Sequence, residues 1–158
     1  MMEPKELRHP SFYEGGYSPD SLFPEDYHFY TGQNREQSYP WMEGQEKIRK
    51  LIKEWQELKP AISGLFGERK AKDASRLMTK GCALFLQFLF WSNGRPVCME
   101  GMEEKIDELQ VKPVNVGERL QFILSHLKLY HSFLQLGELF VEQEKAYAKY
   151  LVIKNRAF

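Results

Sequence analysis

The stretch from Cys82 to Trp91 constrains the fold of this chain more than any other. It reads Cys-Ala-Leu-Phe-Leu-Gln-Phe-Leu-Phe-Trp, so Gln87 is the one strongly polar side chain in it. A helix that is apolar on every side must be surrounded by other elements. Crossing a lipid bilayer takes about twenty apolar residues, roughly twice what this stretch offers. We therefore expect a buried helix at the centre of a folded domain and no membrane span.

Apolar residues recur at helical spacing along the whole chain after Trp41. The pattern predicts five helices and no strand: one that ends before Pro60, and others at about 68–91, 99–109, 116–126 and 128–155. Residues 61–66 are expected to form a connecting turn, and Asn93-Gly94 is expected to end the second helix. The inward stripe of the last helix is predicted to be Phe133, Gly137, Phe140, Tyr147 and Leu151. These features predict an all-α fold, a single bundle of about five helices.

The first forty residues differ from the rest because they carry five of the eight prolines and no helical stripe. Prolines at this density exclude a long helix, although a short helical turn at Pro24 to Tyr30 fits the local sequence. Eight Phe and Tyr residues in the same segment would lose free energy if they were left in water. The sequence therefore predicts two parts, an extended aromatic arm at residues 1–40 that packs on the domain and a helical bundle at residues 41–158.

The charges cancel over the whole chain, with 22 Lys and Arg against 22 Asp and Glu. Without a net basic excess, there is no global attraction to nucleic acid or to an anionic membrane. The chain begins with a charged, Pro-bearing segment rather than a secretory signal. Its two cysteines, Cys82 and Cys98, have no CxxC spacing and are expected to be free thiols. We expect a cytoplasmic protein.

Three segments carry a family resemblance: Trp-Ser-Asn-Gly-Arg-Pro-Val at 91–97, Arg-Leu-Gln-Phe-Ile-Leu at 119–124 and Tyr-His-Ser-Phe-Leu-Gln-Leu at 130–136. Together they resemble the YpoC-like family of small proteins from Bacillus and its relatives, over roughly residues 45–150. The resemblance implies a helical cytoplasmic protein of unassigned function, whose genes tend to neighbour genes of DNA replication, recombination and cell-wall synthesis. It implies no catalytic residues.

Signatures of catalysis are weak throughout the sequence. Glu25 and His28 match the Glu-x-x-His spacing of di-iron bundles, but the second such motif that a di-iron site needs is missing. His126 and His131 are five residues apart, which points them in different directions on a helix. There is no nucleophile elbow, P-loop or dinucleotide fingerprint. We expect no enzymatic activity, no cofactor and no metal.

Basic residues concentrate in the second predicted helix. Arg69, Lys72, Arg76 and Lys80 follow one another at steps of three, four and four residues and form one ridge. Such a ridge could lie along a phosphate backbone. Residues 1–42 carry a net charge of −4 and residues 43–80 a net charge of +4. The acidic arm could therefore pack on the basic segment and mask part of the ridge.

A second candidate surface surrounds the loop after the apolar helix. Glu144 falls on the stripe assigned to the core, where a carboxylate needs a partner such as Arg95 or Arg119. A structural ion pair is the simpler interpretation. The functional alternative is a polar pocket at one end of the bundle, lined by Trp91, Asn93, Arg95 and Glu144.

The leading functional hypothesis is a non-enzymatic protein-interaction module that binds another protein through the arm, the 91–97 loop or an exposed helix face. The alternative is a nucleic-acid-binding accessory protein that uses the Arg69 to Lys80 ridge. The oligomeric state and the identity of the partner stay open at this level.

Overall fold

The structure is a computed structural model that describes residues 3–32, 39–43 and 45–156. Its elements are η1 (Lys5–Leu7), α1 (Pro19–Leu22), α2 (Pro24–Thr31), α3 (Pro40–Glu43), α4 (Gln45–Gly67), α5 (Ala71–Ser92), α6 (Met102–Asp107), α7 (Val116–Ser125) and α8 (Tyr130–Arg156). The described residues contain no strand. The predicted all-α fold is confirmed.

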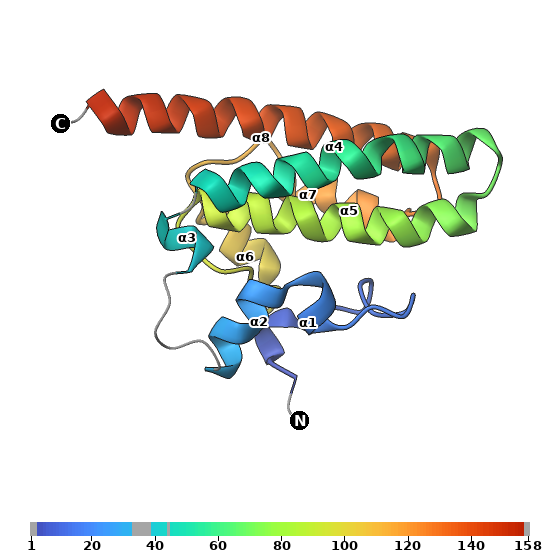
Figure 1. The fold of residues 1–158 in the computed structure, drawn as a ribbon, viewed down its shortest axis with the longest axis horizontal. Coiled ribbons are helices and arrows are strands. Elements are labelled where there is room, and N and C mark those ends of the chain that lie inside the picture. Colours follow the sequence, from blue (N-terminus) through green and yellow to red (C-terminus); the bar gives the residue numbers. More distant parts are fainter. Residues whose placement is uncertain (1–2, 33–38, 44, 157–158) are drawn as a thin grey trace.

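Helix α5 is the centre of the bundle, as its apolar sequence predicted. Every residue from Gly81 to Ser92 is buried. Helices α4, α8, α3 and α1 all pack against it. Figure 1 shows α4, α5 and α8 as three long helices running side by side, with α6 and the N-terminal helices on the opposite side of α5 from α8.

Large rings fill the space where α4, α5 and α8 meet. Trp55 of α4 stacks on Phe140 of α8, with ring centroids 4.4 Å apart and planes 5° apart. Phe85 of α5 meets the same Phe140 ring edge-on at 5.3 Å. A Cβ added at Gly81 would stand 3.0 Å from Cζ3 of Trp55 and 3.1 Å from Cδ2 of Leu136. Glycine at position 81 therefore lets the three helices approach closely.

The prediction that the first helix ends before Pro60 is wrong, because α4 continues through Pro60 to Gly67. Pro60 lies on the exposed side of the helix. The turns beyond it are held by Ile62, which is fully buried, and by Phe66, whose ring contacts Tyr130 and Phe133 of α8. Packing free energy of this kind offsets the hydrogen bond that a proline removes from a helix interior.

The N-terminal segment is more helical than its prolines predicted, since α1 and α2 each begin with a proline at the first helical position. The short helix expected at Pro24 to Tyr30 is present as α2. Residues 3–32 bury Leu7, Phe12, Leu22 and Phe23 completely or nearly so. A buried hydrogen bond from Nε2 of Gln87 to the carbonyl of Leu22, at 2.9 Å, fixes this segment to α5. The division of the chain into two parts at residue 40 stays a prediction.

Candidate interaction surfaces

Trp91, predicted to line a pocket, holds the N-terminal segment in place instead. Its indole is buried at the end of α5, and Nε1 donates to Oδ2 of Asp26 in α2 at 3.0 Å. The same carboxylate oxygen accepts a hydrogen bond from the backbone N–H of Val97 at 2.7 Å. The Tyr30 hydroxyl donates to the Val97 carbonyl at 2.8 Å. These contacts join α2 to the 91–97 loop.

Asp26 is fully buried, and sequence reasoning missed its importance. Burial raises the pKa of its carboxyl group to about 7, although the hydrogen bonds from Trp91 and Val97 act in the opposite direction. Its second oxygen, Oδ1, accepts no hydrogen bond from the described part of the chain. Nothing local marks this aspartate as buried, because its partners lie 65 and 71 residues away in sequence.

Asn93, another predicted pocket residue, uses both ends of its amide to fix the backbone. Its Nδ2 donates to the carbonyls of Leu89 and Val111, both at 2.8 Å. Its Oδ1 accepts from the N–H groups of Gln110 and Val111, at 3.0 and 2.8 Å. Asn93 therefore clamps the segment after α6 to the end of α5, and its amide is occupied by structural hydrogen bonds.

The pocket predicted at this end of the bundle is small, and Glu144 does not line it. Asn93 and Arg95 border a depression of about 90 Å³, and Trp91 borders a neighbouring one of about 120 Å³. Sites for small organic ligands are usually about 300–1,000 Å³. Arg95 makes an exposed ion pair with Glu108 at 3.4 Å. The four residues of this prediction are therefore not brought together in one pocket.

The prediction that Glu144 pairs with Arg95 or Arg119 is also wrong. Helix α8 is rotated slightly from the predicted orientation, so that the residue before Glu144 faces the core. Gln143 takes the buried position and donates from Nε2 to the Val111 carbonyl at 3.0 Å. Arg119 pairs with Glu142, through Nη1 to Oε1 at 3.0 Å and Nη2 to Oε2 at 2.5 Å. These hydrogen bonds lower the pKa of the Glu142 carboxyl group and raise that of the Arg119 guanidinium.

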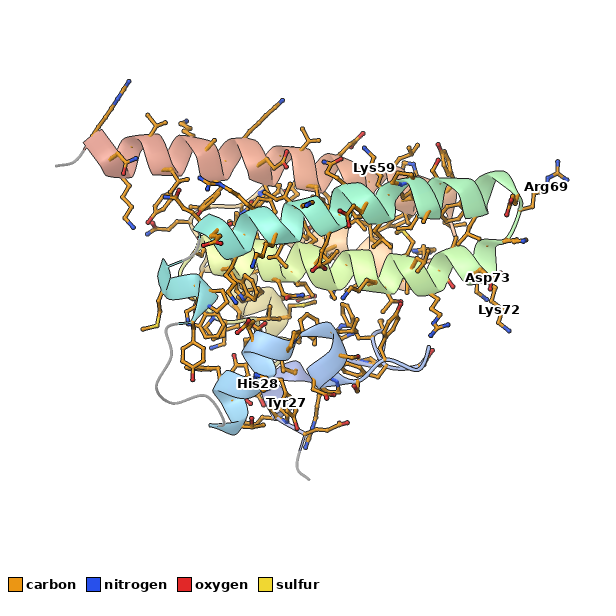
Figure 2. The ribbon with its side chains drawn as sticks, viewed as in Figure 1. Tyr27, His28, Lys59, Arg69, Lys72 and Asp73 are labelled. Carbon is orange, nitrogen blue, oxygen red and sulfur yellow. The ribbon has the colours of Figure 1, made fainter. Side chains whose placement is uncertain are left out.

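The four residues of the basic ridge do not share one environment. Figure 2 shows Arg69 and Lys72, together with Asp73, at the end of the bundle where α4 turns into α5. Lys72 is exposed, whereas Lys80 is half-buried. The guanidinium carbon of Arg76 lies 5.7 Å from the ring centre of Tyr17, whose hydroxyl donates to the Arg76 carbonyl at 3.1 Å. The N-terminal segment thus contacts the ridge at Arg76, whose side chain stays exposed.

A cleft of about 600 Å³ lies beside this ridge, between the N-terminal segment, α5 and the turn from α7 to α8. Its charged lining residues are three cations and two anions, namely Lys72, Arg76, Lys128, Glu14 and Asp73. Ser75 and Thr79, which also line it, donate their hydroxyl hydrogens to carbonyls of α5. The near balance of charge gives a phosphate group little electrostatic advantage here.

Helix α8 carries more exposed large apolar side chains than any other element that the structure describes. The described residues include ten large apolar side chains that are exposed, and half of these lie on α8: Tyr130, Leu134, Val141, Val152 and Ile153. Figure 1 shows α8 along one edge of the bundle, with no other element over its outward side. Four of these residues, Tyr130, Leu134, Val141 and Val152, lie within one narrow stripe of a 3.6-residue helix. We call this stripe, with Gly137, Glu138, Lys145 and Ala148 that lie along it, the α8 face.

A groove of about 400 Å³ runs along the middle of the α8 face. Leu134, Gly137 and Val141 line it, and Lys59 of α4 closes one side, where Figure 2 shows this lysine beside α8. A Cβ at Gly137 would meet no atom within 4 Å, so the glycine leaves an open notch. Sequence reasoning placed Gly137 on the inward stripe. The seven-residue spacing of Leu134, Val141 and Ala148 was the signal that could have identified this second face.

The residues considered for chemistry are engaged elsewhere. Glu25, from the Glu-x-x-His motif, accepts a hydrogen bond from Nζ of Lys47 at 3.0 Å. Cys82 is fully buried, and this burial raises the pKa of its thiol. Over residues 3–32, 39–43 and 45–156, no group of three or more His, Cys, Asp or Glu side chains is placed to hold a metal ion. None of the described helices is both long and apolar enough to cross a membrane.

Comparison with known proteins agrees with the resemblance seen in the sequence. No solved structure matches the chain. The chain is 33% identical over 112 residues to "Uncharacterized protein YpoC" of Bacillus subtilis (strain 168), an alignment that covers 70% of this chain and 68% of that protein. The family model described as "YpoC-like protein" matches residues 45–155, which span α4 to α8 and include the α8 face. The chain belongs to the YpoC-like protein family.

Proposed function

We propose that this protein is a non-catalytic interaction module and that its α8 face docks an amphipathic helix. The observation that carries the proposal is the exposed apolar stripe with the groove along its middle. Monomeric proteins rarely leave a large continuous apolar patch in water. The stripe from Tyr130 to Val152 is about 33 Å long at the rise of an α-helix, which suits a helix of similar length as the occupant.

The chemistry of the α8 face favours a helix over other ligands. Its apolar positions are separated by four, three, four, seven and four residues, from Tyr130 through Leu134, Gly137, Val141 and Ala148 to Val152. These separations match the periodicity of a second helix laid alongside. The open notch at Gly137 provides a place for a side chain of that helix to enter. Glu138 and Lys145 on the same stripe supply one charge of each sign to fix the orientation.

Nucleic-acid binding through Arg69, Lys72, Arg76 and Lys80 has less support. Tyr17 packs against Arg76, whose side chain is still exposed, and Lys80 is half-buried, so the four cations do not form one uniformly free ridge. The cleft beside them contains both signs of charge. Binding of labelled DNA or RNA that weakens steeply with salt would favour this alternative over helix docking.

The proposed location of this module is the reducing cytoplasm. Its support is that the structure leaves both cysteines free, with Cys82 buried in the core and Cys98 half-buried. Buried free thiols are the usual state of cysteine in a reducing compartment.

Site-specific photocrosslinking in the native cell tests helix docking. A photoreactive amino acid is placed at Val141 on the α8 face or, as the matched control, at Val114, which is 75% exposed in a loop. We expect a discrete crosslinked polypeptide from position 141, lost when Leu134 is replaced by Glu, and no such product from position 114. Equal products from both positions, or none from position 141, would contradict the proposal.

A further inference from the structure

We propose that the helix docked on the α8 face is α8 of a second copy of this chain, antiparallel to the first. The inference rests on the proposed function, because it names the occupant of the same face. It is based on the order of residues along the α8 face, which is self-complementary about Val141. A two-fold axis beside Val141 pairs each residue before it with one at the same distance after it.

The apolar positions are spaced symmetrically about Val141. Tyr130 lies eleven residues before it and Val152 eleven residues after it, so each Tyr130 would meet Val152 of the second copy. Leu134 lies seven residues before it, and Ala148 seven residues after it. Each pair joins a large side chain to a smaller one, which lets the two helices interdigitate. Tyr130, Leu134, Val141 and Val152 are each about half exposed in the single chain, so they have surface left to bury.

The charged positions complete the match. Glu138 lies three residues before Val141 and Lys145 four residues after it, on the same flank of the stripe at helical geometry. Oε2 of Glu138 lies 4.0 Å from Nη2 of Arg119 in its own chain, and the glutamate side chain is 62% exposed, so it has surface left for a second cation. A two-fold axis perpendicular to the helices places this flank on the same side of the interface in both copies. Glu138 of each copy then lies against Lys145 of the other, which gives two equivalent pairs. A parallel two-fold arrangement would put this flank on opposite sides of the two helices, so Glu138 and Lys145 would lose this pairing.

Gly137 provides the space that this arrangement needs. It lies four residues before Val141 and therefore opposes Lys145 of the second copy. The notch above it is open, because a Cβ there would meet nothing within 4 Å. The aliphatic stem of Lys145 can cross at this point while its ammonium group reaches Glu138, as long cationic side chains do on apolar surfaces. The open space at Gly137 and the charges of Glu138 and Lys145 thus both favour α8 of a second copy as the docked helix.

Sedimentation of the purified full-length chain over a wide concentration range tests the inference. We expect a reversible dimer with twice the 18.7 kDa mass of one chain. Glu138→Lys and Lys145→Glu should each weaken the dimer about tenfold, because each places like charges opposite one another at both symmetric sites. The double variant E138K/K145E should restore the wild-type dissociation constant. Circular dichroism checks that each variant keeps its helical fold.

Val141→Glu should abolish the dimer, and Val114→Glu, an exposed valine in a loop, should leave it unchanged. A chain that is monomeric at every concentration, or a double variant that stays as weak as the single ones, would overturn the inference. The crosslinking experiment separates this failure from that of the proposed function. A product between position 141 and a different protein would keep helix docking and overturn the second copy as its occupant.

Discussion

The indole of Trp91 and the carboxylate of Asp26 form a hydrogen bond of 3.0 Å inside the protein, although 65 residues separate them in sequence. The pair connects the end of the central helix α5 to α2 in the N-terminal segment. The second carboxylate oxygen of Asp26 accepts no hydrogen bond from the described part of the chain. Burial of the carboxyl group outweighs the hydrogen bonds that it accepts and raises its pKa to about 7, so the stability of the fold depends on pH.

We expect the stability of the wild-type protein to contain a contribution from Asp26 that falls as pH rises. The pKa of this group is about 7 in the folded chain against an ordinary 3.8, so only the folded state keeps the proton between these values. The contribution is therefore full below about pH 4, is lost progressively up to about pH 7 and is constant above that. At about 1.4 kcal/mol for each pH unit between these two pKa values, its size is on the order of 4 kcal/mol.

Urea unfolding at a series of pH values measures this effect as the difference between the wild type and Asp26→Asn. His9 titrates in the opposite sense, because burial lowers its pKa, and the difference removes its contribution. Val114→Ala, which changes an exposed side chain without a titratable group, is the control and should keep the shape of the wild-type profile. Parallel profiles for Asp26→Asn and the wild type would disprove the assigned role.

Replacing Asn93 by Ala should lower the free energy of unfolding by about 2–3 kcal/mol. The change removes four hydrogen bonds and leaves the N–H groups of Gln110 and Val111 without their acceptor. Arg95→Ala, two residues away, removes only an exposed ion pair and should change stability by less than about 0.5 kcal/mol. Denaturant unfolding of both variants makes the comparison, and equal effects would argue against the clamp.

The bidentate pair of Arg119 and Glu142 should join α7 to α8 with a coupling free energy on the order of 1 kcal/mol in a double-mutant cycle. The cycle uses Arg119→Gln, Glu142→Gln and the double variant. Because Arg119 lowers the pKa of Glu142, the coupling should be present above pH 4.5 and be lost as pH falls below it. A coupling that is unchanged by acid would mean that packing, not charge, links the two residues.

Replacing each of two helical glycines by Ala should change the free energy of unfolding in opposite directions. Gly81→Ala places a methyl group against Trp55 and Leu136 and should cost about 1–3 kcal/mol. Gly64→Ala in α4 meets nothing within 4 Å and should stabilise the protein by about 0.5 kcal/mol through helix propensity. Thermal unfolding compares the two, and a stable Gly81→Ala variant would show that the helices can separate locally.

The central part of this fold could be predicted from sequence because it depends on local pattern. The apolar run from Cys82 to Trp91 identified the buried helix, and Asn93-Gly94 identified its end. The predicted helix end at Pro60 was wrong because the preference of proline against helix interiors considers local structure only. Tertiary contacts of Ile62 and Phe66 hold the turns that follow Pro60. The free energy lost with one missing helix hydrogen bond is smaller than the free energy gained by burying these side chains.

The candidate site was harder to predict, for two physical reasons. Each residue along a helix turns the side chain by about 100°. Phe133 and Phe140 of the predicted inward stripe are buried, but continuing four residues beyond Phe140 led to Glu144, whereas the buried residue is Gln143, three residues beyond. The same long helix carries two apolar stripes, and periodicity alone cannot tell which one meets α5. Asp26 gave no signal at all, because a buried carboxyl group is defined by partners far away in sequence.

The arrangement of contacts also implies an order of folding. Helices α4 and α5 are neighbours in sequence and pack along their length, so only a short loop must close to bring them together. The N-terminal segment attaches through bonds that span 65 or more residues, from Leu22 to Gln87 and from Asp26 to Trp91. We expect amides of the α4–α5 hairpin to be the slowest to exchange with deuterium and those of α2 to exchange through an opening that leaves the hairpin intact. A protease would reach the N-terminal segment through that same opening, long before the bundle unfolds.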